Sequence, residues 1–313
     1  MPRQLRIEYE GAIYHLMNRG DHREPIFKTD FDRLNFLQTL EETCLRTDWQ
    51  VHAWCLMGNH FHLVVETPQA NLVAGMKWLL GTYTARFNRR HRLFGHLFSG
   101  RYKSLIVDGS GNGYLRTVCD YVHLNPVRAK LLTAEQSLRD FHWSSYGEYL
   151  KPPSKRAGWL RVDRLLGEMN IPRDSAAGRR QFEQRMEQRR ARETGGDWRA
   201  LRRGWCLGDE TFRQELLAQA HERQGEHHYG GQRREMAEEK AGRVVAEELD
   251  ARGWSETELA RRRKGDVGKV GMAQRLRRET SVTLKWIAAR LRMGSWSHVS
   301  NLLSAARKEE CKK

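Results

Sequence analysis

The fold is decided by Leu56-Met57-Gly58-Asn59-His60-Phe61-His62-Leu63-Val64-Val65-Glu66, a short apolar run that carries two histidines with one aromatic residue between them. Successive side chains of a β-strand point to opposite faces, so His60 and His62 share one face and Phe61 lies on the other. Same-face residues two apart on a strand are separated by about 7 Å, within reach of a single metal ion. The segment therefore predicts a strand with one face for burial and half of a metal site on the other.

The residues around this strand alternate β-like runs with helical periodicity up to about residue 150. Gly58-Asn59 predicts the turn of a hairpin that joins the histidine strand to the strand before it. The expected elements are strands at 12–18, 49–57 and 97–108 and helices at 30–45, 71–91 and 114–125, the first helix capped by Asp30. This order indicates an α+β fold with an antiparallel sheet.

Composition changes near Lys151-Pro152-Pro153-Ser154, after which Arg, Glu, Gln and Ala predominate and β-branched runs are few. We therefore expect an α+β domain over residues 1–150, a helical connecting region over 151–225 and a helical region over 226–313. The expected architecture is α+β followed by an all-α C-terminal extension.

The C-terminal extension ends in two apolar stripes separated by a glycine. Leu284, Ile287, Ala288 and Leu291 form the first stripe, Gly294 interrupts it, and Val299, Leu302 and Leu303 form the second. This pattern predicts a helix-turn-helix whose second helix presents Ser297, His298 and Asn301 to DNA bases. An ordinary helical hairpin remains the alternative.

The charge of the chain favours a polyanionic partner. Lys and Arg number 55 against 39 Asp and Glu, which gives a net charge of +16 and a pI near 9.9. A basic protein without such a partner is the alternative.

No apolar run approaches the ~20 residues of a membrane span, and the N-terminus lacks the apolar segment of a signal peptide. The five cysteines are odd in number and show no Cys-x-x-Cys spacing, so we expect a cytoplasmic protein without a disulfide framework.

A second candidate site lies on the helix that follows the glycine-rich loop at 109–113. Tyr121 and Asn125 are four residues apart and share a helix face if the helix persists that far. Pro126 disfavours helical geometry at Asn125 and predicts the end of the helix there. Tyr114 lies seven residues before Tyr121 on the same face, so it is a rival for any role of Tyr121, and either tyrosine could be an ordinary core residue.

Four groups of residues, in this order, resemble the single-tyrosine HUH transposases of the IS200-like kind, and in particular the REP-associated tyrosine transposases. They are Tyr14-His15-Leu16 with Asn18-Arg19-Gly20, Leu56 to Leu63, Gly95-His96-Leu97-Phe98 with Gly100-Arg101-Tyr102-Lys103, and Tyr121-Val122-His123-Leu124-Asn125-Pro126-Val127-Arg128-Ala129. The resemblance covers roughly the first half of the chain. One departure is Gly58, where the family commonly has proline, and we interpret it as a turn variant.

The resemblance implies an HUH, ferredoxin-like fold in which His60 and His62 bind a divalent metal, Tyr121 is the nucleophile and Asn125 is a third, amide ligand. Imidazole ligands favour Mn²⁺, whereas cellular abundance favours Mg²⁺, so we expect Mg²⁺ or Mn²⁺. From their charge and their position near the motifs, we expect phosphate contacts from Arg19, Arg101, Lys103 and Arg128.

The activity that the resemblance implies is cleavage and strand transfer of single-stranded DNA through a 5′-phosphotyrosine, at hairpin-containing, REP-like DNA. A phenol with a pKa of ~10 is mostly protonated at neutral pH, so it needs a metal that withdraws charge from the phosphate. The long extension favours a self-sufficient monomer over a homodimer.

Two other hypotheses stay open at this point. One is a non-catalytic, sequence-specific DNA-binding regulator that retains the HUH scaffold. The other is a zinc-dependent hydrolase with His52, Cys55, His60 and His62 as ligands, although their spacing matches no common zinc signature.

Overall fold

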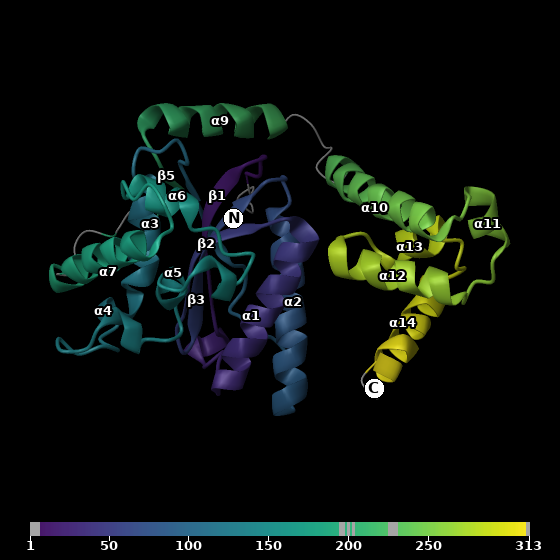
Figure 1. Cartoon of the computed structure of the whole chain (residues 1–313), viewed down its shortest axis with the longest axis horizontal. Helices are drawn as coiled ribbons and strands as arrows, with labels where there is room; N and C mark the ends of the chain where they lie inside the picture. The colour runs from purple at the N-terminus through teal and green to yellow at the C-terminus, as the bar shows by residue number, and fades with distance from the viewer. Residues whose placement is uncertain (1–6, 194–197, 199–200, 202–203, 225–230, 311–313) are drawn as a thin grey trace. The chain divides into compact units, whose positions relative to one another are not determined.

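The computed structural model describes residues 7–193, 198, 201, 204–224 and 231–310 (Figure 1). The chain divides into two compact units, one of residues 1–44 and 48–224 and the other of residues 225–313 with 45–47. The first unit is α+β, and in the described residues of the second unit the regular elements are all helices.

The first unit is built on a five-stranded sheet in the order β2-β3-β1-β4-β5. Its strands are β1 Ala12–Arg19, β2 Gln50–Leu56, β3 His60–Thr67, β4 Lys103–Val107 and β5 Cys206–Leu207. The strands β1 to β4 pair in antiparallel fashion, as expected, but β5 pairs with β4 in parallel. The sheet is therefore mixed, and the expectation of a purely antiparallel sheet is wrong at this edge because a two-residue strand carries no alternation that a sequence pattern could reveal.

Helices cover both faces of this sheet, with α1 and α2 on one side and α3, α5 and α7 on the other (Figure 1). The α-helices of the unit are α1 Asp30–Thr47, α2 Leu72–His91, α3 Tyr114–His123, α4 Asn125–Arg128, α5 Tyr146–Tyr149, α6 Asp163–Glu168, α7 Ala176–Ala191 and α9 Glu210–Gln224. Short 3₁₀ turns lie at Asp21–Arg23, Leu138–Asp140 and Pro153–Lys155. The cap of α1 is Thr29 rather than Asp30, because the Thr29 and Asp32 side chains form a reciprocal capping box.

The apolar face of the histidine strand packs against α1 and α2. The ring of Phe61 lies 4.9 Å, centre to centre, from that of Phe36 on α1, and Phe36 lies 5.1 Å from Tyr83 on α2. All three side chains are fully buried. This packing fixes which face of β3 is turned to the core and leaves His60 and His62 on the opposite face.

The fourth strand is shorter than the sequence pattern predicts. Strand structure begins at Lys103 rather than at Leu97, because Gly100 adopts a positive φ of 64° and turns the chain. Phe98 nevertheless makes an isolated antiparallel bridge with Gly20 at the end of β1. The segment from 97 to 102 is therefore a turn that follows the sheet edge before β4 starts.

Described residues between 160 and 216 pack into the same hydrophobic core as the sheet. Phe182 and Met186 of α7 are fully buried, and the Phe182 ring stacks on Tyr149 with centres 4.8 Å apart. The strand β5 adds main-chain pairing to β4. The region that we expected, from its composition, to be only a connection therefore buries apolar side chains of α7 against the first 150 residues.

The second unit has its own apolar core, formed by five helices. They are α10 Gly231–Arg252, α11 Glu256–Arg261, α12 Val267–Glu279, α13 Leu284–Arg290 and α14 Trp296–Glu310. The turn between α13 and α14 contains Gly294 at a φ of 89°, and Ile287 and Val299 are buried on the two sides of it. Ser297, His298 and Asn301 are exposed on α14.

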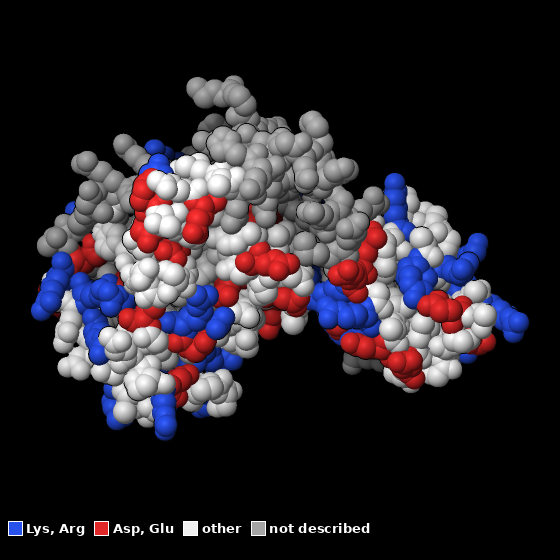
Figure 2. All heavy atoms as spheres, turned by 90° about the horizontal axis from the view of Figure 1, so that it is seen from above, with Lys and Arg blue, Asp and Glu red and all other residues white. Residues whose placement is uncertain are grey.

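Basic and acidic side chains are interspersed on the face of the molecule shown in Figure 2, so the positive surplus does not form one continuous patch there. No helix in the described part of the chain combines the length and the apolar character that crossing a membrane requires.

Candidate active site

The strand register places basic side chains beside the two histidines. Arg19 of β1 pairs directly with His60, and Met17 pairs with His62 on one side and with Lys103 of β4 on the other. Residues that are directly opposite in an antiparallel pair point to the same face. The face of the sheet that carries the two histidines therefore also carries Arg19 and Lys103, both of which are exposed.

The orientation of the His60 ring follows from its neighbour Asn59. The Asn59 Nδ2 donates to the carbonyl oxygen of Arg23 at 3.0 Å, which leaves Asn59 Oδ1 facing His60 Nδ1 at 2.7 Å. An amide oxygen only accepts hydrogen bonds, so His60 Nδ1 carries the proton and Nε2 keeps its lone pair. Burial and the charge of Arg19 lower the pKa of His60 to about 4, so the ring is neutral at pH 7. Such a ring is a metal ligand through Nε2.

His62 is held by a second histidine, His15 of β1. The His15 Nε2 lies 2.9 Å from His62 Nδ1, and the two rings stack with centres 5.1 Å apart. Burial lowers the pKa of His62 well below its ordinary value, with further contributions from His15 and His60, and burial and Arg128 lower the pKa of His15 to about 4. Two neutral rings at this distance share one proton, so one nitrogen donates and the other accepts.

His15 was not among the site residues expected from the sequence. It lies in the quoted segment Tyr14-His15-Leu16, but the distance between His15 and His62 depends on the pairing of β1 with β3, which places His15 opposite Val64. The alternation of side chains along a strand shows which residues share a face of β1 with His15. It does not show which strand is the neighbour of β1, so the contact with His62 cannot be predicted from it.

Tyr121 lies over this histidine group in the same chain. Its ring centre is 5.6 Å from that of His15 and 5.8 Å from that of His62, and its side chain is 6% exposed. The helix α3 is held by fully buried apolar residues on its inner face, among them Leu115, Val118 and Val122. Tyr114, the rival, is the first residue of α3, two turns before Tyr121.

Asn125 begins a new helical turn rather than continuing α3. The helix α3 ends at His123, and α4 starts at Asn125 with Pro126 in its first turn, a position where proline is well tolerated. The Asn125 side chain is 7% exposed, and its Nδ2 has no hydrogen-bond partner. The unpartnered Nδ2 is a hydrogen-bond donor, so a metal could be bound by this side chain only through its oxygen, Oδ1.

Arg128 lies against Tyr121 instead of facing solvent. Its guanidinium carbon is 4.1 Å from the centre of the Tyr121 ring, and its Nη2 donates to the Tyr121 carbonyl oxygen. Its Nη1 lies 3.5 Å from the carboxylate of Glu193, and Trp198 packs 5.4 Å from the Tyr121 ring on the same side. A phosphate contact by Arg128, as expected from the sequence, would have to displace Glu193.

Of the other expected phosphate contacts, Arg101 is exposed in the turn before β4, and Arg19 and Lys103 are exposed beside the histidines. The side chains of Ser297, His298 and Asn301 belong to the second unit.

The residues of the zinc hypothesis are not brought together. His52 Nε2 lies 2.9 Å from Glu66 Oε2, and Cys55 is fully buried with its Sγ 3.5 Å from Met57 Sδ. In the described ranges no three His, Cys, Asp or Glu side chains are arranged to hold a metal. Two imidazoles and one amide oxygen, from His60, His62 and Asn125, are a different donor set, and the free Nε2 of His60 fits it.

A histidine pair on an inner strand, with a tyrosine carried over it by a helix, defines the class of single-tyrosine HUH nucleases. Residues 8–125 match the family described as "Transposase IS200 like". This part of the chain is an IS200-like transposase domain, and it contains His60, His62, Tyr121 and Asn125. Nucleases of this class are typically metal-dependent.

Several solved structures are similar to the chain, and two of them are transposases. One is a REP-associated tyrosine transposase bound to a REP hairpin, with 13% identity, a TM-score of 0.40, and coverage of 52% of this chain and 90% of that one. The other is a "putative transposase" from Deinococcus radiodurans R1, with 18% identity, a TM-score of 0.29, and coverage of 39% and 95%. A search of curated proteins gives no match.

Proposed function

We propose that the protein cuts and rejoins single-stranded DNA through a covalent link between Tyr121 and a 5′-phosphate. The observation that carries this proposal is the approach of the Tyr121 ring to the rings of His15 and His62 within one chain, at 5.6 and 5.8 Å. A tyrosine with no role beyond packing would not need two neutral imidazoles beside it. The match of residues 8–125 to the transposase family supports the same reaction.

The reaction balances without a nucleotide cofactor. The Tyr121 Oη forms a bond to phosphorus while the bond from phosphorus to O3′ breaks, the phenolic proton passes to solvent, and the 3′ oxygen gains a proton. The phosphoester energy is kept in the tyrosine link, so the 3′-hydroxyl of another strand can reverse the step and complete strand transfer.

His60, His62 and Asn125 would hold Mg²⁺ or Mn²⁺ through Nε2, Nε2 and Oδ1. A divalent metal supplies charge neutralisation at the scissile phosphate. Asn59 and His15 fix the two imidazoles through their Nδ1 atoms, so the ligand atoms are oriented before any metal arrives. Arg19 and Lys103 flank the histidines and would bind neighbouring phosphates.

We further propose that the substrate carries a hairpin of the REP kind. Four motifs in family order support it, and a hairpin is what the similar REP-associated transposase binds. The second unit would then locate DNA through Ser297, His298 and Asn301, which are exposed on α14. One chain supplies Tyr121 and both histidines, so a monomer suffices.

The test is a denaturing gel of the protein incubated with labelled single strands that bear hairpins, with Mg²⁺, with Mn²⁺ or with chelator. We expect a metal-dependent shift to a covalent adduct that Tyr121→Phe abolishes and Tyr114→Phe retains. Binding without an adduct in any metal would instead favour the non-catalytic regulator.

A further inference from the structure

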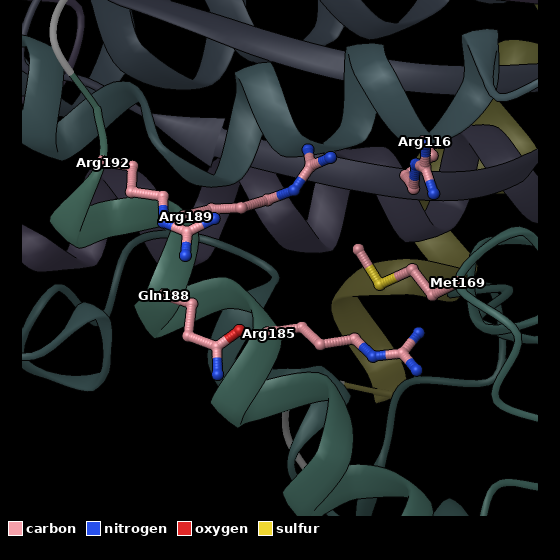
Figure 3. Close-up of a pocket in the computed structure, with 6 residues that line it drawn as sticks. All are labelled: Arg116, Met169, Arg185, Gln188, Arg189 and Arg192. Carbon is pink, nitrogen blue, oxygen red and sulfur yellow. The ribbon is translucent and has the colours of Figure 1, made fainter.

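A cavity of about 190 Å³ between α3 and α7 is lined almost entirely by arginine (Figure 3). Its lining residues are Arg116, Met169, Arg185, Gln188, Arg189 and Arg192. Figure 3 shows Arg185, Arg189 and Arg192 leaving the same helical segment, with Arg116 across from them on α3. The positions 185, 188, 189 and 192 follow the three- and four-residue spacing of one helix face, so α7 presents a single basic stripe to this cavity.

In the described part of the chain, the four arginines at this cavity outnumber the carboxylates near them. Three carboxylates lie close by: Asp120 forms an ion pair with Arg189, Glu193 adds a favourable charge to Arg189, and Glu168 accepts the main-chain N–H of Arg116 at 2.8 Å. Within the described residues, Arg185 and Arg192 have no acidic partner. Burial and the nearby charge of Arg116 lower the pKa of Arg189, which shows that the guanidinium groups repel one another. An anion between them would remove this repulsion.

The side chains that line the cavity favour a phosphate over other anions. Guanidinium groups present several N–H donors in a planar fork that matches phosphate oxygens, and they stay charged at any physiological pH. Besides the arginines, the cavity is lined by one thioether and one amide, and by no carboxylate. A phosphate group on an extended chain fits such a site better than a bulky ligand does.

The cavity is coupled to the nucleophile through α3. Arg116 precedes Tyr121 by five residues, about 7.5 Å of helix rise. Arg189 pairs with Asp120, the residue next to Tyr121, and the Asp120 side chain is fully buried. A strand whose scissile phosphate reached Tyr121 would have its neighbouring phosphates within a few ångströms of α3.

From these observations we propose that the arginine cavity binds a backbone phosphate of the single-stranded DNA substrate, flanking the phosphate that is cut. This assignment rests on the proposed function for its substrate. It concerns a site that lies mostly outside the family match, because of the lining residues only Arg116 falls within residues 8–125. The cavity would thus add a chain-specific anchor to the IS200-like domain.

The experiment measures anisotropy of a labelled single strand with the full chain in chelator, over a range of salt concentrations. The variant is Arg185→Gln with Arg192→Gln. The matched control is Arg173→Gln with Arg180→Gln, which removes the same charge from exposed positions that do not line the cavity. We expect the cavity variant to lose about tenfold in affinity relative to the control and to lower the salt slope by about 0.7–1.4, one or two phosphate contacts.

Equal affinities and slopes for the two variants would overturn the assignment. A second result would also overturn the assignment. If inorganic phosphate stabilises the wild type but not the cavity variant, and both proteins bind DNA equally well, the cavity holds a free anion rather than a DNA phosphate. Because chelator prevents cleavage, loss of DNA binding in the cavity variant remains readable even if Tyr121 forms no adduct.

Discussion

His15 Nε2 and His62 Nδ1 lie 2.9 Å apart across two adjacent antiparallel strands. Because His15 stands opposite Val64, the two histidines are diagonal neighbours on one face, which their rings can bridge. The contact decides the tautomer of His62. If His15 accepts, His62 carries its proton on Nδ1 and leaves Nε2 free for a metal; if His15 donates from Nε2, His62 Nε2 carries the proton and cannot bind one.

Removing the acceptor at His15 should therefore weaken metal binding. We expect His15→Leu to lower Mn²⁺ affinity by about 10–100-fold, as other losses of a hydrogen bond to a ligating histidine do. His15→Gln, whose amide oxygen can reach the position of Nε2, should stay within a few-fold of the wild type. Isothermal titration calorimetry without DNA measures both.

Thermal unfolding of the same two variants shows whether His15 orients the His62 ring or only stabilises the fold. If His15→Leu and His15→Gln are equally stable and bind Mn²⁺ equally well, His15 only packs. A long-range nitrogen NMR spectrum of the metal-free protein gives an independent reading, since it should show the Nδ1–H tautomer for both His60 and His62.

The Asn125 side chain should contribute an oxygen ligand. We expect Asn125→Ala to weaken Mn²⁺ binding by about tenfold, whereas Asn125→Asp should retain it because a carboxylate oxygen replaces the amide oxygen. Calorimetry at constant pH measures the difference between the two variants. Equal affinities for Asn125→Ala and the wild type would remove Asn125 from the ligand set.

Many secondary-structure elements of the first unit can be predicted from local sequence patterns, whereas contacts between residues far apart in sequence cannot. The turn at Gly58-Asn59, the alternation of His60, Phe61 and His62, and the helix from residue 72 to 91 all follow from short-range rules. The contacts of His15 with His62 and of Arg128 with Glu193 join residues far apart in sequence, so they depend on strand register and on packing that no local pattern encodes. The parallel strand β5 was missed for the same reason.

Acid should destabilise the first unit through His123. Burial lowers the pKa of His123 to about 3, and its Nε2 lies 2.8 Å from Ser145 Oγ. The His123 imidazole therefore binds a proton near pH 6.5 in the unfolded chain but only near pH 3 in the folded chain. The free energy of unfolding consequently falls as the pH drops from about 6.5 towards 3, and His123 accounts for at most about 4–5 kcal/mol of this loss.

Chemical denaturation at several pH values, followed by tryptophan fluorescence, checks this expectation. His123→Gln should reduce the pH dependence without abolishing it, because burial also lowers the pKa values of His15 and His60 to about 4, and the exposed His142→Gln should leave it unchanged. An unchanged slope in His123→Gln would mean that another group carries the acid sensitivity.

The exposed face of α14 should read duplex DNA. With a duplex selected from a random pool by the wild-type protein, His298→Ala and Asn301→Ala should each cost about 1–3 kcal/mol of binding free energy. Binding to unselected duplex should not change, since neither side chain is positively charged. Equal losses on both duplexes, or none, would leave the second unit without a sequence-reading role.

Tyr121 itself should become covalently linked to DNA. The direct measurement is mass spectrometry of the protease- and nuclease-digested product after incubation with Mn²⁺ and a hairpin-bearing single strand. We predict a 5′-phosphonucleotide on the peptide that contains Tyr121. A nucleotide on Tyr114, or no linked peptide although the strand is cut, would contradict the account.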